Sequence, residues 1–239
     1  MKPRARSSLV LLVASTACAS PAHTPARAAA AAQPAPAAAP SALQLDRHEN
    51  EIRAFETADR TLMPAPGGIL FTGSSSIRLW RSLESDFAGL PVLNRGFGGS
   101  TLPEVNHYFS RVVMPYRPRT IVLYAGDNDV AIGRTPQQVA SDYRTFVRLV
   151  RDSLRDARIV FVGIKPSPSR WRMAEQQREA NRLVREIVAS DSLQSFVDVF
   201  TPMLGANGRP RPEFFIADSL HMTPAGYVVW RAQVAPHVR

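Results

Sequence analysis

A serine directly after a predicted strand is the first residue of this sequence that could carry out covalent chemistry. The apolar run 69–71 follows two glycines and is broken at Gly73, which predicts a buried strand that ends abruptly. Ser74, Ser75 and Ser76 come next. Ligands of an open α/β sheet bind beyond the carboxyl ends of its strands, so a nucleophile would be displayed here. The alternative is that these serines only cap a helix or stabilise a turn, and Ser76 is the expected cap.

An acid and a base lie close together near the C-terminus. Asp218 precedes His221 by three residues, and Thr223 followed by Pro224 predicts the start of a helix. Both side chains therefore belong to one tight turn. An aspartate that accepts the Nδ1–H of a histidine fixes the histidine tautomer and leaves Nε2 free as a general base. This pattern favours a catalytic pair over a lone structural histidine.

Two further loops follow predicted strands. Gly98 and Gly99 belong to a stretch with three glycines in four positions, which lets the backbone approach a ligand and expose its N–H groups. A flexible turn is the alternative. Asn128 could donate its side-chain amide into a cleft, as an oxyanion hole requires. Calcium binding is the alternative for the acids Asp127 and Asp129, although the spacing and the closing glutamate of an EF-hand loop are absent.

Elements that could position these residues alternate along the chain. Strands are expected at 68–72, 91–94, 119–124, 158–163 and 195–199, and helices at 42–62, 136–155, 173–189 and 224–235. The clearest helix begins with Thr135 as cap, Pro136 at its first position and Gln138 completing a capping box. Alternating strands and helices predict an α/β fold, a three-layer α/β/α sandwich with a doubly wound parallel sheet of about five strands.

Composition and charge exclude several classes of function. The formal charge of +9 falls by three, to +6, when Lys2, Arg4 and Arg6 of the expected targeting segment are removed. The remaining basic residues are spread along the chain, unlike the clustered basic stripe of a nucleic-acid-binding protein. We therefore expect no nucleic-acid partner. No G-x-G-x-x-G motif follows a predicted strand, which argues against a nucleotide cofactor.

The N-terminus is typical of an exported protein. Residues 1–20 combine a basic start, a short apolar run and small residues, which predicts a secretory signal too short to span a bilayer permanently. The single cysteine, Cys18, allows neither an intramolecular disulfide nor a cysteine zinc site. It lies either in a cleavage site with Ala17 and Ala19 or in a lipoprotein box, where it would be lipidated and anchor the protein. Ser15 departs from the leucine usual in that box.

An alanine- and proline-rich segment separates this signal from the folded domain. Residues 21–42 cannot bury a core and predict a semi-extended linker. The folded domain is expected over residues 43–239. We therefore expect a bacterial protein that is periplasmic, envelope-anchored or secreted.

The chemistry-bearing residues together resemble the four ordered blocks of the SGNH/GDSL hydrolase superfamily. The blocks are Gly73-Ser74-Ser75, the Gly98-Gly99 turn, the loop 126–129 and Asp218-x-x-His221. The resemblance covers about residues 67–227. The sequence departs from the common pattern at Ser74, where the family usually has aspartate, and at Ser100, where aspartate is frequent. Neither is a triad position, so loop geometry and substrate preference are what these differences affect.

The resemblance implies a role for each matching residue. Ser75 matches the nucleophile, Asp218 the acid and His221 the general base. The backbone N–H groups of Ser75 and Gly99, with the side-chain amide of Asn128, match the oxyanion hole. The choice of Ser75 among three serines follows from the resemblance.

The implied function is a cofactor-free and metal-free serine esterase or acylhydrolase that cleaves carboxylic esters. Its substrate would be a small-molecule, glycan or lipid ester, acetyl or longer. The alternatives are an acyltransferase of the same fold acting on envelope glycans, and a non-catalytic envelope binding module. The loop 165–171 should lie beside the same cleft, where Trp171 would either shape the acyl or alcohol site or pack on the core. The sequence does not determine the oligomeric state.

Overall fold

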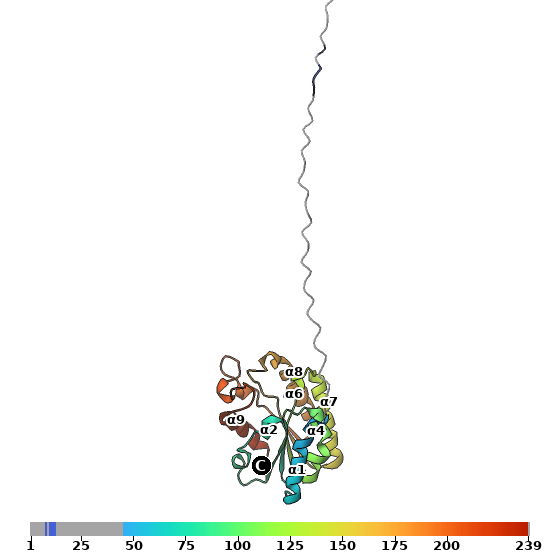
Figure 1. Ribbon diagram of the computed structural model, residues 1–239, viewed down its shortest axis with the longest axis vertical. Coiled ribbons are helices and arrows are strands. Elements are labelled where there is room, and N and C mark those ends of the chain that lie inside the picture. The colour runs from blue at the N-terminus through green and yellow to red at the C-terminus, as the bar shows by residue number, and fades with distance from the viewer. Residues whose placement is uncertain (1–7, 9, 13–44, 239) are drawn as a thin grey trace, which may run out of the picture. The chain divides into compact units, whose positions relative to one another are not determined.

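The computed structural model describes residues 8, 10–12 and 45–238 (Figure 1). The expected linker and Cys18, with almost all of the expected signal, lie outside the described residues. No described helix is long and apolar enough to cross a membrane.

Five parallel strands form one sheet in the order β2-β1-β3-β4-β5. Their bounds are β1 Ile69–Gly73, β2 Val92–Gly96, β3 Thr120–Tyr124, β4 Arg158–Val162 and β5 Gln194–Val197. Each strand lies within two residues of its predicted limits. The expected parallel α/β sheet is confirmed.

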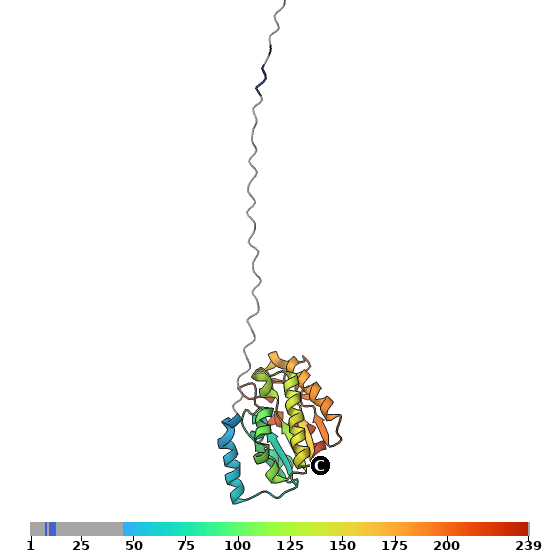
Figure 2. The ribbon, with the colours of Figure 1, turned by 90° about the vertical axis from the view of Figure 1, so that its right-hand side faces the viewer.

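Helices cover both faces of this sheet. One face carries α1 (Glu49–Thr61), α4 (Leu102–His107), α5 (Phe109–Val112), α7 (Pro136–Ser153) and α8 (Ala174–Val188), as Figure 2 shows. The other carries α2 (Ser75–Arg78), α3 (Leu83–Asp86) and α9 (Pro224–Val234). Helix α6 (Asp127–Ala131) follows β3. Short 3-10 helices are η1 (Leu45–His48), η2 (Met114–Tyr116), η3 (Trp171–Met173), η4 (Thr201–Met203), η5 (Pro212–Phe214) and η6 (Ala235–His237).

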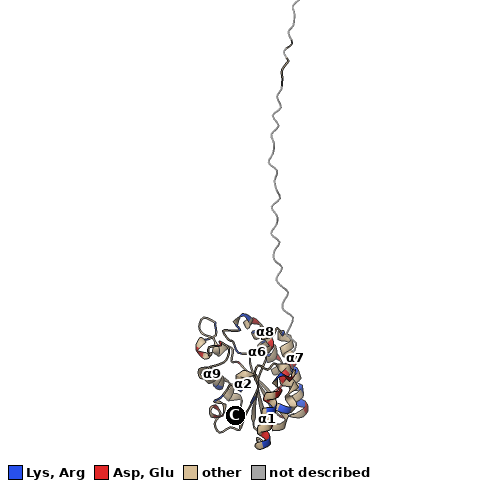
Figure 3. Ribbon diagram, viewed as in Figure 1, with Lys and Arg blue, Asp and Glu red and all other residues tan. Residues whose placement is uncertain are grey.

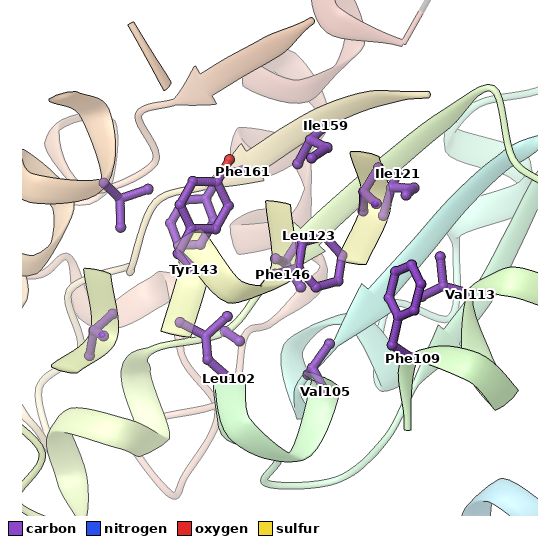
Figure 4. Close-up of a cluster of buried hydrophobic side chains, with 14 of the residues drawn as sticks. Leu102, Val105, Phe109, Val113, Ile121, Leu123, Tyr143, Phe146, Ile159 and Phe161 are labelled. Carbon is purple, nitrogen blue, oxygen red and sulfur yellow. The ribbon is translucent and has the colours of Figure 1, made fainter. Parts of the chain in front are cut away.

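The strands alternate between two apolar cores, one on each face. Ile121 and Leu123 of β3 pack against Phe146 of α7 in the first core (Figure 4). Val122 and Tyr124 of the same strand point to the second core. All five side chains are fully buried. This period of two, with helices on both faces, is what a buried parallel strand requires.

The longest helix begins as its sequence predicts. The Thr135 hydroxyl accepts the Gln138 N–H at 3.2 Å, and the Gln138 side chain accepts the Thr135 N–H at 2.9 Å. These reciprocal bonds satisfy two N–H groups that the start of a helix would otherwise leave free.

Basic and acidic residues are intermixed over the outer helices (Figure 3).

Strand β1, which lies between β2 and β3, ends at a glycine that the backbone of β3 makes obligatory. Gly73 pairs with Gly96 of β2 on one side and with Tyr124 of β3 on the other. Its φ of +116° belongs to a region that side chains other than hydrogen rarely adopt, and a Cβ atom there would lie 2.0 Å from the Tyr124 carbonyl oxygen. The turn toward Ser75 therefore requires glycine.

We expect Gly73→Ala to lower the free energy of unfolding by more than about 4 kcal/mol, because the added methyl group collides with the backbone of β3. Gly67→Ala is the matched control, since Gly67 has a φ of +82° but no atom within 4 Å of an added Cβ. The control should lose only the roughly 1–2 kcal/mol of left-handed strain. Urea titration of both variants tests this, and equal losses would contradict it.

Candidate active site

The predicted nucleophile lies in the turn between β1 and α2. Ser75 is the first residue of α2, and its Oγ lies 2.9 Å from Nε2 of His221, which is 146 residues further along the chain. Ser74 occupies the N-cap position of α2 and has an extended backbone conformation. Its N–H donates to the Tyr124 carbonyl at 2.9 Å. The expectation that Ser76 caps the helix is therefore wrong, because the helix has already begun there.

The predicted acid and base share one turn. His221 Nδ1 lies 2.5 Å from Asp218 Oδ2, while Asp218 Oδ1 accepts the backbone N–H groups of Leu220 and His221 at 2.9 Å each. Ser219 has a left-handed φ of +57°, which closes the turn. Partial burial raises the pKa of Asp218, but these hydrogen bonds outweigh it and lower the pKa to about 2. Asp218 is therefore ionised at neutral pH.

Helix α9 fixes this turn against the nucleophile turn. It starts at Pro224 with Thr223 as cap, immediately after His221. The hydroxyl of Tyr227 donates to the backbone carbonyl of Ser76 at 3.0 Å across the second core. Ser75, His221 and Asp218 are thus brought together as the sequence predicts, in one line of hydrogen bonds.

Gly99 lies in the loop after β2, with a φ of +70°. Its N–H and that of Ser75 donate to no acceptor in the part of the chain that the structure describes. The neighbouring Gly98 N–H donates to both carboxylate oxygens of Glu51, at 3.0 and 3.1 Å, and Arg47 donates to the Gly99 carbonyl at 2.6 Å. Arg47 of η1 and Glu51 of α1 thus hold the loop after β2 through its backbone. Sequence analysis missed Arg47 and Glu51, since nothing local distinguishes them from other polar residues of an amphipathic helix.

Asn128 lies in the first turn of α6, directly after β3. Its Nδ2 donates to the Ser100 carbonyl at 3.1 Å, and its Oδ1 accepts from Arg170 Nη2 at 3.0 Å. Sequence analysis expected the loop 165–171 beside this cleft but gave Arg170 no role, because its contact joins residues 42 positions apart along the chain. The hydrogen bond to Ser100 directly connects the loop 126–129 with the loop that carries Gly98 and Gly99.

The loops that carry Ser75, Gly99 and Asn128 leave the same edge of the sheet. They follow β1, β2 and β3, which are neighbours whose last residues are in register. The Phe97 N–H donates to the Gly73 carbonyl at 2.9 Å, which continues this register into the loops. Gly99 and Asn128, the expected donors in the two outer loops, therefore lie on opposite sides of the turn that carries Ser75.

A cavity of about 320 Å³ opens beside the histidine. It lies between the segment after α2 and the start of α9, and its wall is mostly apolar. The lining residues are Leu79, Arg81, Ser82, Ile216, His221, Met222, Pro224 and Tyr227. Trp171 is not among them. Its ring lies 6.4 Å from the Phe200 ring and beneath the guanidinium of Arg209, which favours packing on the core over a place in this cavity.

The two acids beside Asn128 are buried in different surroundings. Asp129 accepts the Leu102 N–H, and burial raises its pKa to about 7. Burial would also raise the pKa of Asp127, but the charges of Lys165 and Arg170 reverse this and lower it. Within residues 45–238, no three histidine, cysteine or acidic side chains are placed to hold a metal ion.

The sequence model of the GDSL-like Lipase/Acylhydrolase family matches residues 68–229, a range that includes Ser75, Gly99, Asn128, Asp218 and His221. This chain belongs to that family. It is accordingly a hydrolase of the GDSL type.

One known protein resembles this GDSL hydrolase in sequence, and two solved structures resemble it in fold. Platelet-activating factor acetylhydrolase IB subunit alpha2 of Gallus gallus is 26% identical over 171 residues, 66% of this chain and 70% of the relative. A Streptococcus pneumonia protein described as a platelet activating factor has a TM-score of 0.72 at 18% identity, over 82% of this chain and 94% of its own. An acetylxylan esterase of Geobacillus stearothermophilus has a TM-score of 0.59 at 15% identity, over 73% and 95%.

We expect the raised pKa of Asp129 to make stability depend on pH. The folded protein binds a proton that the unfolded chain, with a pKa near 3.8, releases above about pH 4. The contribution of Asp129 to the free energy of unfolding is therefore fully present below about pH 4 and is lost as the pH rises through about 7. For a shift of this size the loss is roughly 2–4 kcal/mol.

Asp129→Asn keeps an acceptor for the Leu102 N–H but cannot titrate. Denaturant unfolding at pH 5 and pH 8 should show that this variant loses less stability than the wild type between the two values. Asp152→Asn, at an exposed position on α7, is the matched control and should behave like the wild type. A wild type whose stability is flat over this window would refute the expectation.

Proposed function

We propose that this chain is a serine esterase that cleaves carboxylic esters through Ser75, His221 and Asp218. The observation that carries the proposal is the distance of 2.9 Å between Ser75 Oγ and His221 Nε2, with Nδ1 of the same ring against the Asp218 carboxylate. A hydroxyl, an imidazole and a carboxylate in this order form an activated nucleophile.

The geometry supports a two-step reaction. His221 Nε2 takes the Ser75 proton while Oγ attacks the ester carbonyl, and the imidazolium then gives that proton to the departing alcohol. Water, deprotonated by the same nitrogen, releases the acid from the acyl-enzyme. Asp218 stays ionised throughout, because its pKa is about 2, and it holds the ring tautomer and stabilises the imidazolium.

The negative oxygen of each tetrahedral intermediate would be stabilised by three donors. These are the backbone N–H groups of Ser75 and Gly99 and one N–H of the Asn128 amide. Donors fixed in advance at the place where charge develops contribute much of the rate of acyl transfer. The two backbone groups have no other acceptor in the described chain, which supports this assignment.

The substrates we propose are short acyl esters, with acetyl esters first among them. The curated relative is an acetylhydrolase and one structural neighbour is an acetylxylan esterase. The cavity of about 320 Å³ beside His221 is at the small end of the range for ligand sites. Export, with Cys18 as a site of lipid attachment, belongs to the proposal on the evidence of the sequence alone.

We expect the purified protein to hydrolyse p-nitrophenyl acetate and butyrate faster than the octanoate, and Ser75→Ala to abolish this activity. Ser153→Ala, at an exposed end of α7, is the matched control and should keep full activity. Activity that survives in the Ser75 variant would show that the nucleophile or the mechanism is wrong. No hydrolysis by folded wild-type protein would refute the esterase proposal.

We expect Asn128→Ala to lower kcat by roughly 10²–10³ with little change in KM, as the loss of one oxyanion donor does in subtilisin. The reason is that this donor acts on the charge that exists only in the transition state. Steady-state kinetics with p-nitrophenyl acetate measures it. An unchanged kcat would remove Asn128 from the oxyanion hole.

A further inference from the structure

One largely buried arginine next to the site has no part in the proposed mechanism. Arg170 lies in the loop between β4 and α8, with 16% of its side chain exposed. Its guanidinium joins two neighbouring residues of α6. Nη1 lies 2.9 Å from Asp127 Oδ1, and Nη2 donates to Asn128 Oδ1 at 3.0 Å.

We propose that Arg170 is a positioning residue, which orients the Asn128 side-chain amide so that one N–H is directed to the oxyanion. This inference rests on the proposed function. Rotation of an asparagine amide by 180° exchanges its oxygen and its nitrogen, and such a rotation would turn a donor into an acceptor.

The neighbours of Asn128 select one of the two orientations. A guanidinium has only donors, so the amide atom next to Arg170 must be the oxygen. A backbone carbonyl only accepts, so the atom next to Ser100 must be the nitrogen, and the distance there is 3.1 Å. One N–H is then occupied by Ser100. The second has no acceptor in the described part of the chain, which leaves it for the substrate.

A buried network holds the arginine in place. Asp127, almost fully buried, accepts from Lys165 Nζ at 3.2 Å and from Gln177 Nε2 at 3.1 Å, besides its contact with Arg170. The carboxylate is thus held on several sides, and a guanidinium fork bonded to it loses most of its rotational freedom. The positive charge next to Asn128 Oδ1 also polarises the amide and strengthens its N–H groups as donors.

The same loop reaches the other half of the site. The Ser169 N–H, one residue before Arg170, donates to the Ser219 carbonyl at 3.1 Å. Ser219 lies between Asp218 and His221. One loop therefore contacts both the oxyanion residue and the turn of the acid and base, which fixes the place of Arg170 relative to each.

The test is a double-mutant cycle on kcat with p-nitrophenyl acetate, using the full chain. Arg170→Met should lower kcat by roughly 10–100-fold, with KM changed less than about twofold. In the Asn128→Ala background the same substitution should change kcat less than about twofold, because the amide that it positions is gone. Arg172→Met removes the same charge at an exposed position of the same segment and should keep wild-type kcat.

A second readout is independent of ester turnover. A fluorophosphonate probe places its phosphoryl oxygen where the oxyanion forms, so its rate of covalent labelling, measured by mass spectrometry, should fall in Arg170→Met as kcat does. Labelling rates that equal those of the wild type would overturn the inference, as would kcat losses that multiply in the double variant. If Asn128→Ala has no effect, the oxyanion assignment fails first. If only Arg170→Met has none, the positioning role alone fails.

Discussion

The carbonyl oxygen of Tyr124 approaches Gly73 so closely that no side chain could stand there. This contact results from parallel pairing in the middle of the sheet, where β1 lies between β2 and β3 with their last residues in register. The chain therefore leaves the sheet at the same height after each of these three strands. Each of the three loops carries a residue of the proposed site, so the relative positions of Ser75, Gly99 and Asn128 follow from the pairing of main chains.

The two sides of the site are built differently. On the acid–base side, Asp218 and His221 are three residues apart and their geometry is local. Backbone N–H groups of the turn hold the Asp218 carboxylate, and this carboxylate in turn orients the His221 ring. On the oxyanion side, the contacts are long-range. Arg170 and Glu51 each bind a loop from a distant part of the chain. Arg170, which is largely buried, is paired with Asp127, as the burial of a charge requires.

The sequence was sufficient for the fold and for Ser75, Asp218 and His221, which the structure brings together. Strands β1, β3 and β4 were predictable because each contains a short apolar run. His221 was predictable because Asp218 stands three residues before it, whereas Ser75 was chosen among three serines by the family resemblance. The roles of Arg47, Glu51 and Arg170 were not predictable, because each acts through long-range contacts that no local pattern records. Lys165 illustrates the same limit. It is one of two lysines in the chain and is buried beside Asp127.

The order of the residues along the chain has a consequence for biosynthesis. All five strands, and with them the Ser75 turn, precede residue 198, whereas Asp218 and His221 come later and are held by α9. A chain that folds from its N-terminal part onward could therefore complete its sheet before the proposed base is in place. An unactivated serine is a weak nucleophile. On the proposed mechanism, hydrolytic activity then appears only when α9 has docked, after the sheet has formed.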